Sequence, residues 1–148
     1  MIQTLIISIS FAIVISAICS LCEAVLYSIT ASQVEMLKKN GYTSAEHLQN
    51  LRSDIEEPIT AILTLNTIAN TIGASIAGAA IAKIYGDEKV LLFSSFFTLT
   101  ILIFSEILPK TIGVNYAFKL APWVPYPLRI MVFLLKPIVW LCRTIMRL

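Results

Sequence analysis

The stretch that decides the fold is the N-terminal run Met1–Cys22, MIQTLIISISFAIVISAICSLC, which contains no charged residue. Two more charge-free runs follow, Pro58–Ala82 and Val90–Ser105, and Glu106 ends the last of them. A helix needs about 20 predominantly apolar residues to cross the hydrocarbon core of a bilayer, and each run reaches that length with its flanks. We therefore predict an all-α integral membrane protein with three transmembrane helices, at about residues 3–29, 58–83 and 89–113.

Composition supports a membrane protein. The chain is 57% hydrophobic and 14% charged, whereas soluble domains have about 45–50% apolar and about 25% charged residues. The net charge of +2 is too small to indicate nucleic acid as a partner. A cleaved signal peptide is the alternative for the first run, but it requires a basic n-region. Met1–Thr4 has no basic residue, so a retained first span is favoured.

The polar segment 31–57 is predicted to form a pair of short helices outside the bilayer core. Ser32–Glu35 and Thr43–Glu46 both fit the capping-box pattern, and Gly41 between them is typical of a helix stop. Pro58 then opens the second span at a position where its missing N–H costs no hydrogen bond.

The segment 120–148 is predicted to be interfacial or re-entrant. Arg129, Lys136 and Arg143 recur every seven residues and Arg147 follows four later, so one continuous helix would carry them as a cationic stripe facing an aromatic and aliphatic surface. This pattern is typical of a helix that lies in the membrane interface. The prolines of the segment also favour broken, re-entrant or surface-lying pieces, namely Pro122, Pro125, Pro127 and Pro137. A span would bury Lys136, at about 3 kcal/mol on insertion scales. A fourth span is nevertheless the alternative.

The distribution of lysine and arginine predicts the orientation. Residues 31–57 carry three, the connection 83–89 carries two, and the chain from Lys110 onward carries six. Because short cytoplasmic flanks are enriched in these residues, we expect the N-terminus outside and the C-terminus in the cytoplasm. The protein would be a multi-pass protein of the plasma (inner) membrane, with its juxtamembrane amphipathic helices on the cytoplasmic side.

Polar and ionisable side chains inside the spans indicate a functional site, because each is costly unless it faces the protein interior. The three sets are Ser16, Ser20, Glu23 and Tyr27 on one face of the first span, Asn66 and Asn70 in the second, and Ser105, Glu106, Pro109, Lys110 and Gly113 in the third.

Pro109 is predicted to break the third span. Its ring removes one N–H and clashes with the carbonyl of Ser105, four residues back. A lone carbonyl at membrane depth survives only if it is buried in protein or lines a wet cavity. Oxygen groups beside Glu106 suit a hard cation such as Mg²⁺ or Na⁺. His47 is the single histidine, so no Cys/His cluster is expected.

Structural interpretations stand beside the functional ones. Ser16 alone is typical of a serine that bonds back to its own helix, and Asn66 with Asn70 could simply hydrogen-bond helices together. The small residues of 73–80 predict a close helix-packing surface that includes, in one interpretation, a dimer contact. Glu106 and Lys110 are one turn apart and could form a structural ion pair.

Three motifs resemble those of the transmembrane domain of the CNNM/CorC family, a cyclin M-like family. They are SLCEA at residues 20–24, LNTIAN at 65–70 and SEILPKTIG at 105–113, the last being the most specific. The resemblance covers essentially all of residues 1–148 as a single domain. It implies Mg²⁺ export in exchange for Na⁺ by a homodimer, with three spans per protomer and a belt of juxtamembrane helices.

The same resemblance implies a metal site in an inward-facing cavity. Its ligands would be Ser20, Asn66, Asn70, Glu106 and a backbone oxygen near Gly113, with Glu23, Ser105, Pro109 and Lys110 as second-rank candidates.

No activated nucleophile or His-containing dyad occurs in the spans, so no enzyme is predicted. The alternative function is a divalent-cation-sensing membrane anchor that signals to attached cytosolic domains without transport.

Relatives in that family usually continue into cytosolic CBS domains that bind adenine nucleotides. No such segment occurs within the 148 residues, so nucleotide regulation is not expected of this chain. We expect either an excised membrane domain or a natural minimal version.

Overall fold

The three apolar runs form three long helical spans in the computed structural model, which describes residues 1–148. α1 covers Ile2–Ser28 and α4 covers Glu56–Tyr85. The third span is made of consecutive elements, namely η1 (Asp87–Lys89), α5 (Val90–Ile101), the π-helix η2 (Leu102–Ile107) and α6 (Leu108–Asn115). All three spans are long and apolar enough to cross a membrane. The predicted all-α fold with three transmembrane helices is confirmed.

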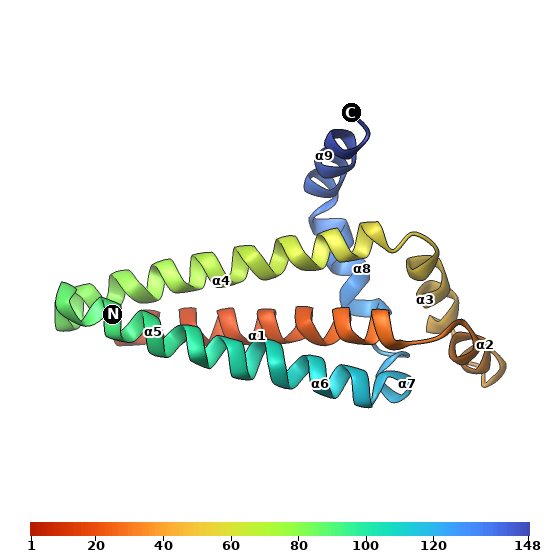
Figure 1. The fold of residues 1–148 in the computed structure, drawn as a ribbon, viewed down its shortest axis with the longest axis horizontal. Coiled ribbons are helices and arrows are strands. Elements are labelled where there is room, and N and C mark those ends of the chain that lie inside the picture. Colours follow the sequence, from red (N-terminus) through yellow and green to blue (C-terminus); the bar gives the residue numbers. More distant parts are fainter.

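The helix α1 contacts both other spans and is seen between them in Figure 1, and α4 also contacts α5. It runs antiparallel to α4, since Gly73 lies against Ala12 whereas the earlier residue Asn70 bonds to the later residue Ser16. The polar residue Asn70 and the small residue Gly73 of α4 therefore both face α1, about one helical turn apart.

The third span runs parallel to α1. Ser105 in η2 bonds to Ile13, and Gly113 in α6 lies against Leu21. The α1 helix therefore packs against α4 and also against η2 and α6.

Glycine permits the closest helix contacts. A Cβ atom on Gly73 would overlap the Cβ of Ala12 and lie 3.3 Å from the Ser8 carbonyl oxygen. A Cβ on Gly78 would meet nothing within 4 Å. The predicted close-packing surface is therefore present at Gly73 and does not extend to Gly78 within one chain.

The polar pair of helices is α2 (Ala31–Lys39) and α3 (Ser44–Ser53). The capping box of α2 is formed by Thr30 and Gln33, so the predicted cap at Ser32 is wrong by two residues. The Thr30 hydroxyl accepts from the Gln33 N–H at 3.2 Å, and the Gln33 side chain accepts from the Thr30 N–H at 3.0 Å. Thr43 precedes α3 without a side-chain cap bond.

Gly41 ends α2 as predicted. It has φ of +86°, a region that glycine enters without strain. Its N–H bonds to the Lys38 carbonyl and the Tyr42 N–H bonds to the Leu37 carbonyl, both at 3.1 Å. This is the paired-bond helix ending that favours glycine after the C-cap.

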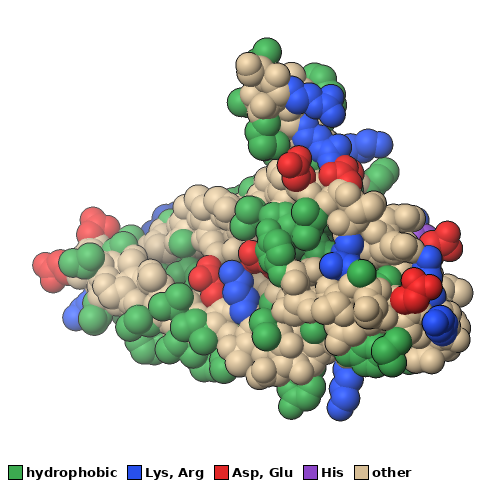
Figure 2. Space-filling model, turned by 45° about the vertical axis from the view of Figure 1, so that its right-hand side comes forward, with side chains coloured by type: hydrophobic (Ala, Val, Ile, Leu, Met, Phe, Trp, Pro, Cys, Tyr) green, Lys and Arg blue, Asp and Glu red, His purple; other side chains and the backbone are tan.

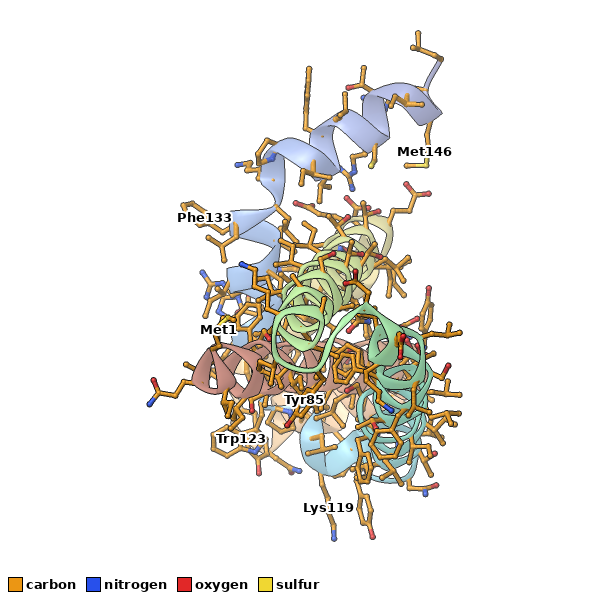
Figure 3. The ribbon with its side chains drawn as sticks, turned by 90° about the vertical axis from the view of Figure 1, so that its left-hand side faces the viewer. Met1, Tyr85, Lys119, Trp123, Phe133 and Met146 are labelled. Atoms are coloured by element: carbon orange, nitrogen blue, oxygen red, sulfur yellow. The ribbon has the colours of Figure 1, made fainter.

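The C-terminal region forms three short helices, α7 (Ala117–Leu120), α8 (Pro125–Leu134) and α9 (Lys136–Met146). α8 has 10 residues and α9 has 11, and neither reaches the roughly 20 residues of a span. The alternative of a fourth span is wrong. α8 crosses the bundle and α9 projects to one side of it (Figures 1 and 3), with Phe133 pointing away from the bundle.

The cationic residues do not share one helix, so the single stripe does not form, whereas the broken pieces that the prolines favour are present. The helix stops at Leu135 (φ −101°, ψ 10°), and α9 begins again with Lys136 and Pro137. Pro137 has no N–H to donate, and its ring would clash with the Phe133 carbonyl if the helix continued. Arg129 and Arg143 therefore lie on separate helices and have separate partners.

The main hydrophobic core lies where the C-terminal half of α1 meets the short helices. Its fully buried members include Val25, Leu26, Ile29, Leu37, Leu48, Ile62 and Leu128. Along the spans, by contrast, large apolar side chains are exposed, with Leu91 at 78% and Phe96 at 72%. Figure 2 shows hydrophobic side chains on the flanks of the bundle and many charged ones at its ends and on α9. An apolar exterior of this kind suits lipid rather than water.

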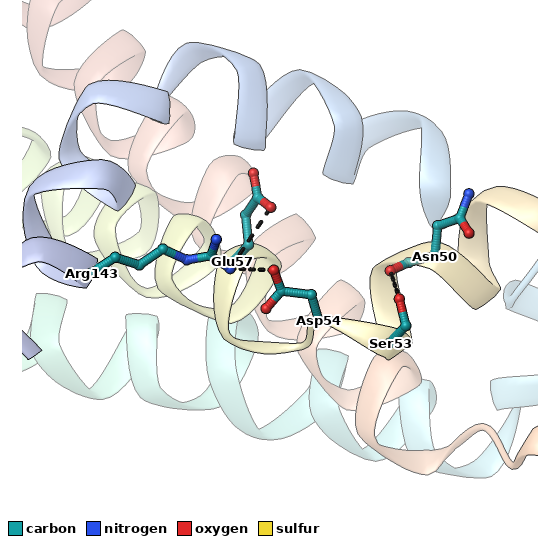
Figure 4. Close-up of polar contacts among 5 residues, drawn as sticks. All are labelled: Asn50, Ser53, Asp54, Glu57 and Arg143. Carbon is teal, nitrogen blue, oxygen red and sulfur yellow. Dashed lines mark hydrogen bonds and ion pairs between the residues drawn. The ribbon is translucent and has the colours of Figure 1, made fainter. Parts of the chain in front are cut away.

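Arg143 connects α9 to the start of α4. Its guanidinium donates a hydrogen bond to Asp54 and lies 3.9 Å from the Glu57 carboxylate (Figure 4). The hydrogen bond with Asp54 raises the pKa of Arg143, and the charges of Asp54, Glu57 and Glu56 raise it further. The guanidinium therefore stays charged throughout the physiological pH range. Ser53, beside Asp54, closes the end of α3 by donating to the Asn50 carbonyl.

We expect Arg143→Met to loosen α9 from the bundle, because the new side chain fills similar space but bonds to neither carboxylate. Amide hydrogen exchange of the chain in lipid nanodiscs should be faster across α9 by a few-fold at most, since an exposed ion pair is weak. High salt should reproduce part of this change in the parent. Exchange in α1 is the internal reference, and equal exchange in α9 of parent and variant would contradict the prediction.

Candidate functional site

The face of α1 that looks toward the other spans carries two buried hydroxyl groups. Ser16 is fully buried and Ser20 is 1% exposed. The Ser16 hydroxyl accepts a hydrogen bond from Asn70 Nδ2 at 3.4 Å, so its partner is on another helix and not in its own backbone. The Ser20 hydroxyl is buried and has no hydrogen-bond partner. Since an unsatisfied buried polar atom is costly, Ser20 requires an explanation beyond packing.

The two asparagines of α4 lie one turn apart and contact each other. Asn70 Nδ2 is 3.4 Å from Asn66 Oδ1, whereas Asn70 Oδ1 is buried without a partner. Both bonds of Asn70 Nδ2 are long for N–H···O hydrogen bonds and are correspondingly weak. The interpretation that these amides join helices is right for Asn70 Nδ2, which bridges α4 to Ser16. It leaves the Asn70 oxygen unexplained.

The third span stays helical at Pro109, so the predicted break is wrong in form. The proline is accommodated by the π-helix η2, in which the Leu108 N–H bonds to the Ile103 carbonyl five residues back. In this wider register the residue five before Pro109 is Phe104, whereas the predicted loss of a donor at Ser105 assumed the four-residue register of an α-helix. Single π-helical turns are frequent at functional sites.

Ser105 and Glu106 have different surroundings. Ser105 is fully buried and donates to the Ile13 carbonyl at 3.2 Å, which holds η2 against α1. Glu106 is half-buried and, with Asn70, lines a groove of about 390 Å³. No lysine or arginine nitrogen lies within 4.0 Å of its carboxylate. The groove is completed by Thr71, Ala74, Phe97, Thr98, Ile101 and Leu102.

Lys110 forms its ion pair with Glu23 and not with Glu106. Lys110 Nζ lies 3.2 Å from Glu23 Oε2, so the alternative of a Glu106–Lys110 pair is wrong. The reason is the wider turn of η2, which ends between the two residues. Residues four apart across it do not lie above one another as they do in an α-helix.

Gly113 is buried where α6 meets α1. An added Cβ would lie 2.7 Å from the Ala24 Cβ and 3.0 Å from the Leu21 carbonyl oxygen. The glycine therefore allows a close approach at the level next to Ser20. A backbone ligand near Gly113 remains a prediction.

Ser16, which the sequence places on the same face of the first span as Ser20, is a direct partner of Asn70. Two threonines of the site were not recognisable as such in the sequence. Thr71 and Thr98 line the groove, but threonines in membrane helices commonly bond back to their own backbone, as Thr98 does to Ser94 at 2.8 Å. Within residues 1–148 no three His, Cys, Asp or Glu side chains gather. A cation would thus rely on neutral oxygens and few carboxylates.

Comparisons with known proteins identify relatives along almost the whole chain. The family model of the cyclin M transmembrane N-terminal domain matches residues 7–148. The UPF0053 protein sll1254 of Synechocystis is 38% identical over 130 residues, 88% of this chain and 38% of that protein. The UPF0053 inner membrane protein YfjD of Escherichia coli is 30% identical over 133 residues, 90% of this chain and 31% of that protein. The chain spans about a third of the length of these relatives.

Proposed function

The chain belongs to the cyclin M transmembrane N-terminal domain family, and from this transporter-like membrane domain we propose a function in Mg²⁺ export coupled to Na⁺. The family predicted from the three motifs is thereby confirmed. The observation that carries the proposal is the pair of buried oxygen atoms without partners, Ser20 Oγ and Asn70 Oδ1, on facing helices. Oxygen atoms kept free at this cost are suitable ligands for a hard cation.

Mg²⁺ would be the transported substrate, and each site residue would have a separate role in binding it. Glu106 would supply negative charge, because no basic side chain neutralises it. Ser20, Asn66 and Asn70 would supply neutral oxygens. α1 and α4 run antiparallel, so one turn on from the Ser16–Asn70 contact Asn66 comes to the level of Ser20. Mg²⁺ gives up its water reluctantly, so we propose few direct ligands and several retained waters.

We also propose a plasma-membrane location with the short helices on the cytoplasmic side. The segments 31–57 and 110–148 carry three and six of the Lys and Arg residues, nine of eleven in all. Their short helices α2, α3 and α7 lie at the end of the bundle where α1 finishes, and α9 projects from its side (Figure 1). This arrangement follows the positive-inside rule. The proposed homodimer would cover part of the exposed apolar surface of α5, where only Phe97 is buried.

Liposome flux tests the proposed function. The chain is reconstituted with a Mg²⁺-sensitive dye inside, and Mg²⁺ is added outside with or without an opposing Na⁺ gradient. We expect Mg²⁺ entry that empty liposomes lack and that the Na⁺ gradient accelerates. Mg²⁺ binding without any flux would contradict transport and support the cation-sensing membrane anchor.

We expect Ser20→Ala to stabilise the chain and weaken its Mg²⁺ binding. Removing an unsatisfied buried hydroxyl should raise the free energy of unfolding by about 1 kcal/mol without Mg²⁺, because the desolvation cost disappears. Thermal unfolding in detergent, with and without Mg²⁺, measures both effects. Ser16→Ala is the matched control, since its hydroxyl has a partner and its loss brings no gain. A destabilised Ser20→Ala chain with parental Mg²⁺ binding would contradict a ligand role.

A further inference from the structure

The ion pair between Glu23 and Lys110 joins α1 and α6 beside the proposed ion site. Glu23 follows Ser20 by three residues on α1, and Lys110 follows Glu106 by four in the third span. Glu23 is thus about one turn from Ser20, and Lys110 is four residues from Glu106 along the third span. The charge of Glu23 is compensated within the chain, whereas that of Glu106 is not.

The two side chains of the ion pair differ in how much of their surface is exposed. The Glu23 side chain is 20% exposed and the Lys110 side chain is 47% exposed. A lysine ammonium is a compact charge on a flexible four-carbon stem, and it can stay in water while the stem lies along apolar surface. Lys110 can therefore withdraw from Glu23 without any helix moving.

We propose that Lys110 is a tethered counter-cation that competes with the transported ion for Glu23. Without the ion, Lys110 neutralises Glu23. When Mg²⁺ arrives, Glu23 turns from the ammonium to the ion or to its retained water, and Lys110 moves toward solvent. When Lys110 recaptures Glu23, the ion is released more easily. This inference rests on the proposed function, because it assigns a regulator to that same site.

Charge balance gives the direction and size of the effect. Glu23, Glu106 and Lys110 together carry −1, and removing the ammonium leaves −2 beside a divalent cation. Mg²⁺ affinity should then rise about tenfold, a conservative figure for a partly exposed charge. A transport site must bind weakly enough for the ion to leave, so tighter binding should slow flux at saturating Mg²⁺.

Calorimetric titration with Mg²⁺ in nanodiscs and liposome flux together test the inference. Lys110→Met should bind Mg²⁺ about tenfold more tightly and transport more slowly at saturation. Glu23→Gln should bind about tenfold more weakly, because the unpaired ammonium then repels the ion. The double variant Glu23→Gln/Lys110→Met should return toward parental affinity. Lys119→Met is the matched control, since that lysine contacts only the Tyr116 ring at 5.7 Å and has no ion pair.

The outcomes separate this inference from the proposed function. A merely structural pair predicts that Lys110→Met lowers thermal stability and leaves Mg²⁺ affinity unchanged, which would overturn the inference. If Lys110→Met does not fold, parental affinity in Glu23→Gln would overturn it equally. The proposed function would still stand in both cases if Glu106→Gln lost Mg²⁺ binding. If the parent itself binds no Mg²⁺, the proposed function fails and the inference falls with it.

Discussion

Glu106→Gln should abolish measurable Mg²⁺ export and lower Mg²⁺ affinity by about a hundredfold, a change of about 2.7 kcal/mol. Glutamine keeps the size of the side chain and one acceptor oxygen but removes the charge. Glu106 is the half-buried carboxylate that shares a groove with Asn70 and has no basic partner, so a divalent ion would lose its main electrostatic attraction. Titration in nanodiscs and dye-reported flux in liposomes measure the two effects.

The fold should tolerate this substitution, because Glu106 forms no ion pair that could be lost. Thermal unfolding without Mg²⁺ should therefore match the parent, which separates loss of binding from loss of structure. Glu88→Gln is the matched control, with the same change of charge on the exposed connection between α4 and α5. If Glu106→Gln and Asn70→Ala both transport like the parent, the site assignment is wrong.

The spans were predictable because a single physical constraint dominates them. A charge inside the hydrocarbon core is costly, so the charge-free runs at 1–22, 58–82 and 90–105 mark the bundle without knowledge of packing. The end of α2 at Gly41 was equally local, since it depends on one residue with positive φ. The C-terminal region was harder, because the periodicity of Arg129, Lys136 and Arg143 assumes one helix. The prolines of the segment favour broken pieces, and the helix is interrupted beside Pro137, but prolines alone do not specify how the pieces are arranged.

The site was predictable by residue type but not by pairing. Ser20, Asn70 and Glu106 stand out because polar groups are rare at membrane depth. Whether Lys110 turns to Glu106 or to Glu23 depends on the angle that η2 introduces, and a proline in sequence does not specify whether a helix kinks or widens. Ser20 Oγ and Asn70 Oδ1 lack hydrogen-bond partners because of the way three helices pack together. A sequence pattern within one segment does not predict this.

Gly73→Ala should separate α1 from α4 and weaken both the fold and the site. The added methyl group would overlap the Ala12 Cβ, which is fully buried, and would lie 3.3 Å from the Ser8 carbonyl oxygen. Overpacking of this kind typically costs about 1–3 kcal/mol. Asn70 is three residues from Gly73, so its 3.4 Å contact with Ser16 should lengthen and Mg²⁺ affinity should fall. Thermal unfolding and Mg²⁺ titration of the same preparation measure both consequences.

The same helix provides the control and the same contact provides the rescue. Gly78→Ala makes the identical change in α4 at a position where a Cβ meets nothing within 4 Å. The stability of the single chain should therefore be unchanged or slightly higher, since alanine favours helix over glycine. Ala12→Gly combined with Gly73→Ala removes the overlapping methyl group from the other side and should restore much of the lost stability. A loss in Gly78→Ala as large as that in Gly73→Ala would contradict a steric origin within the chain and would place Gly78 against a second copy instead.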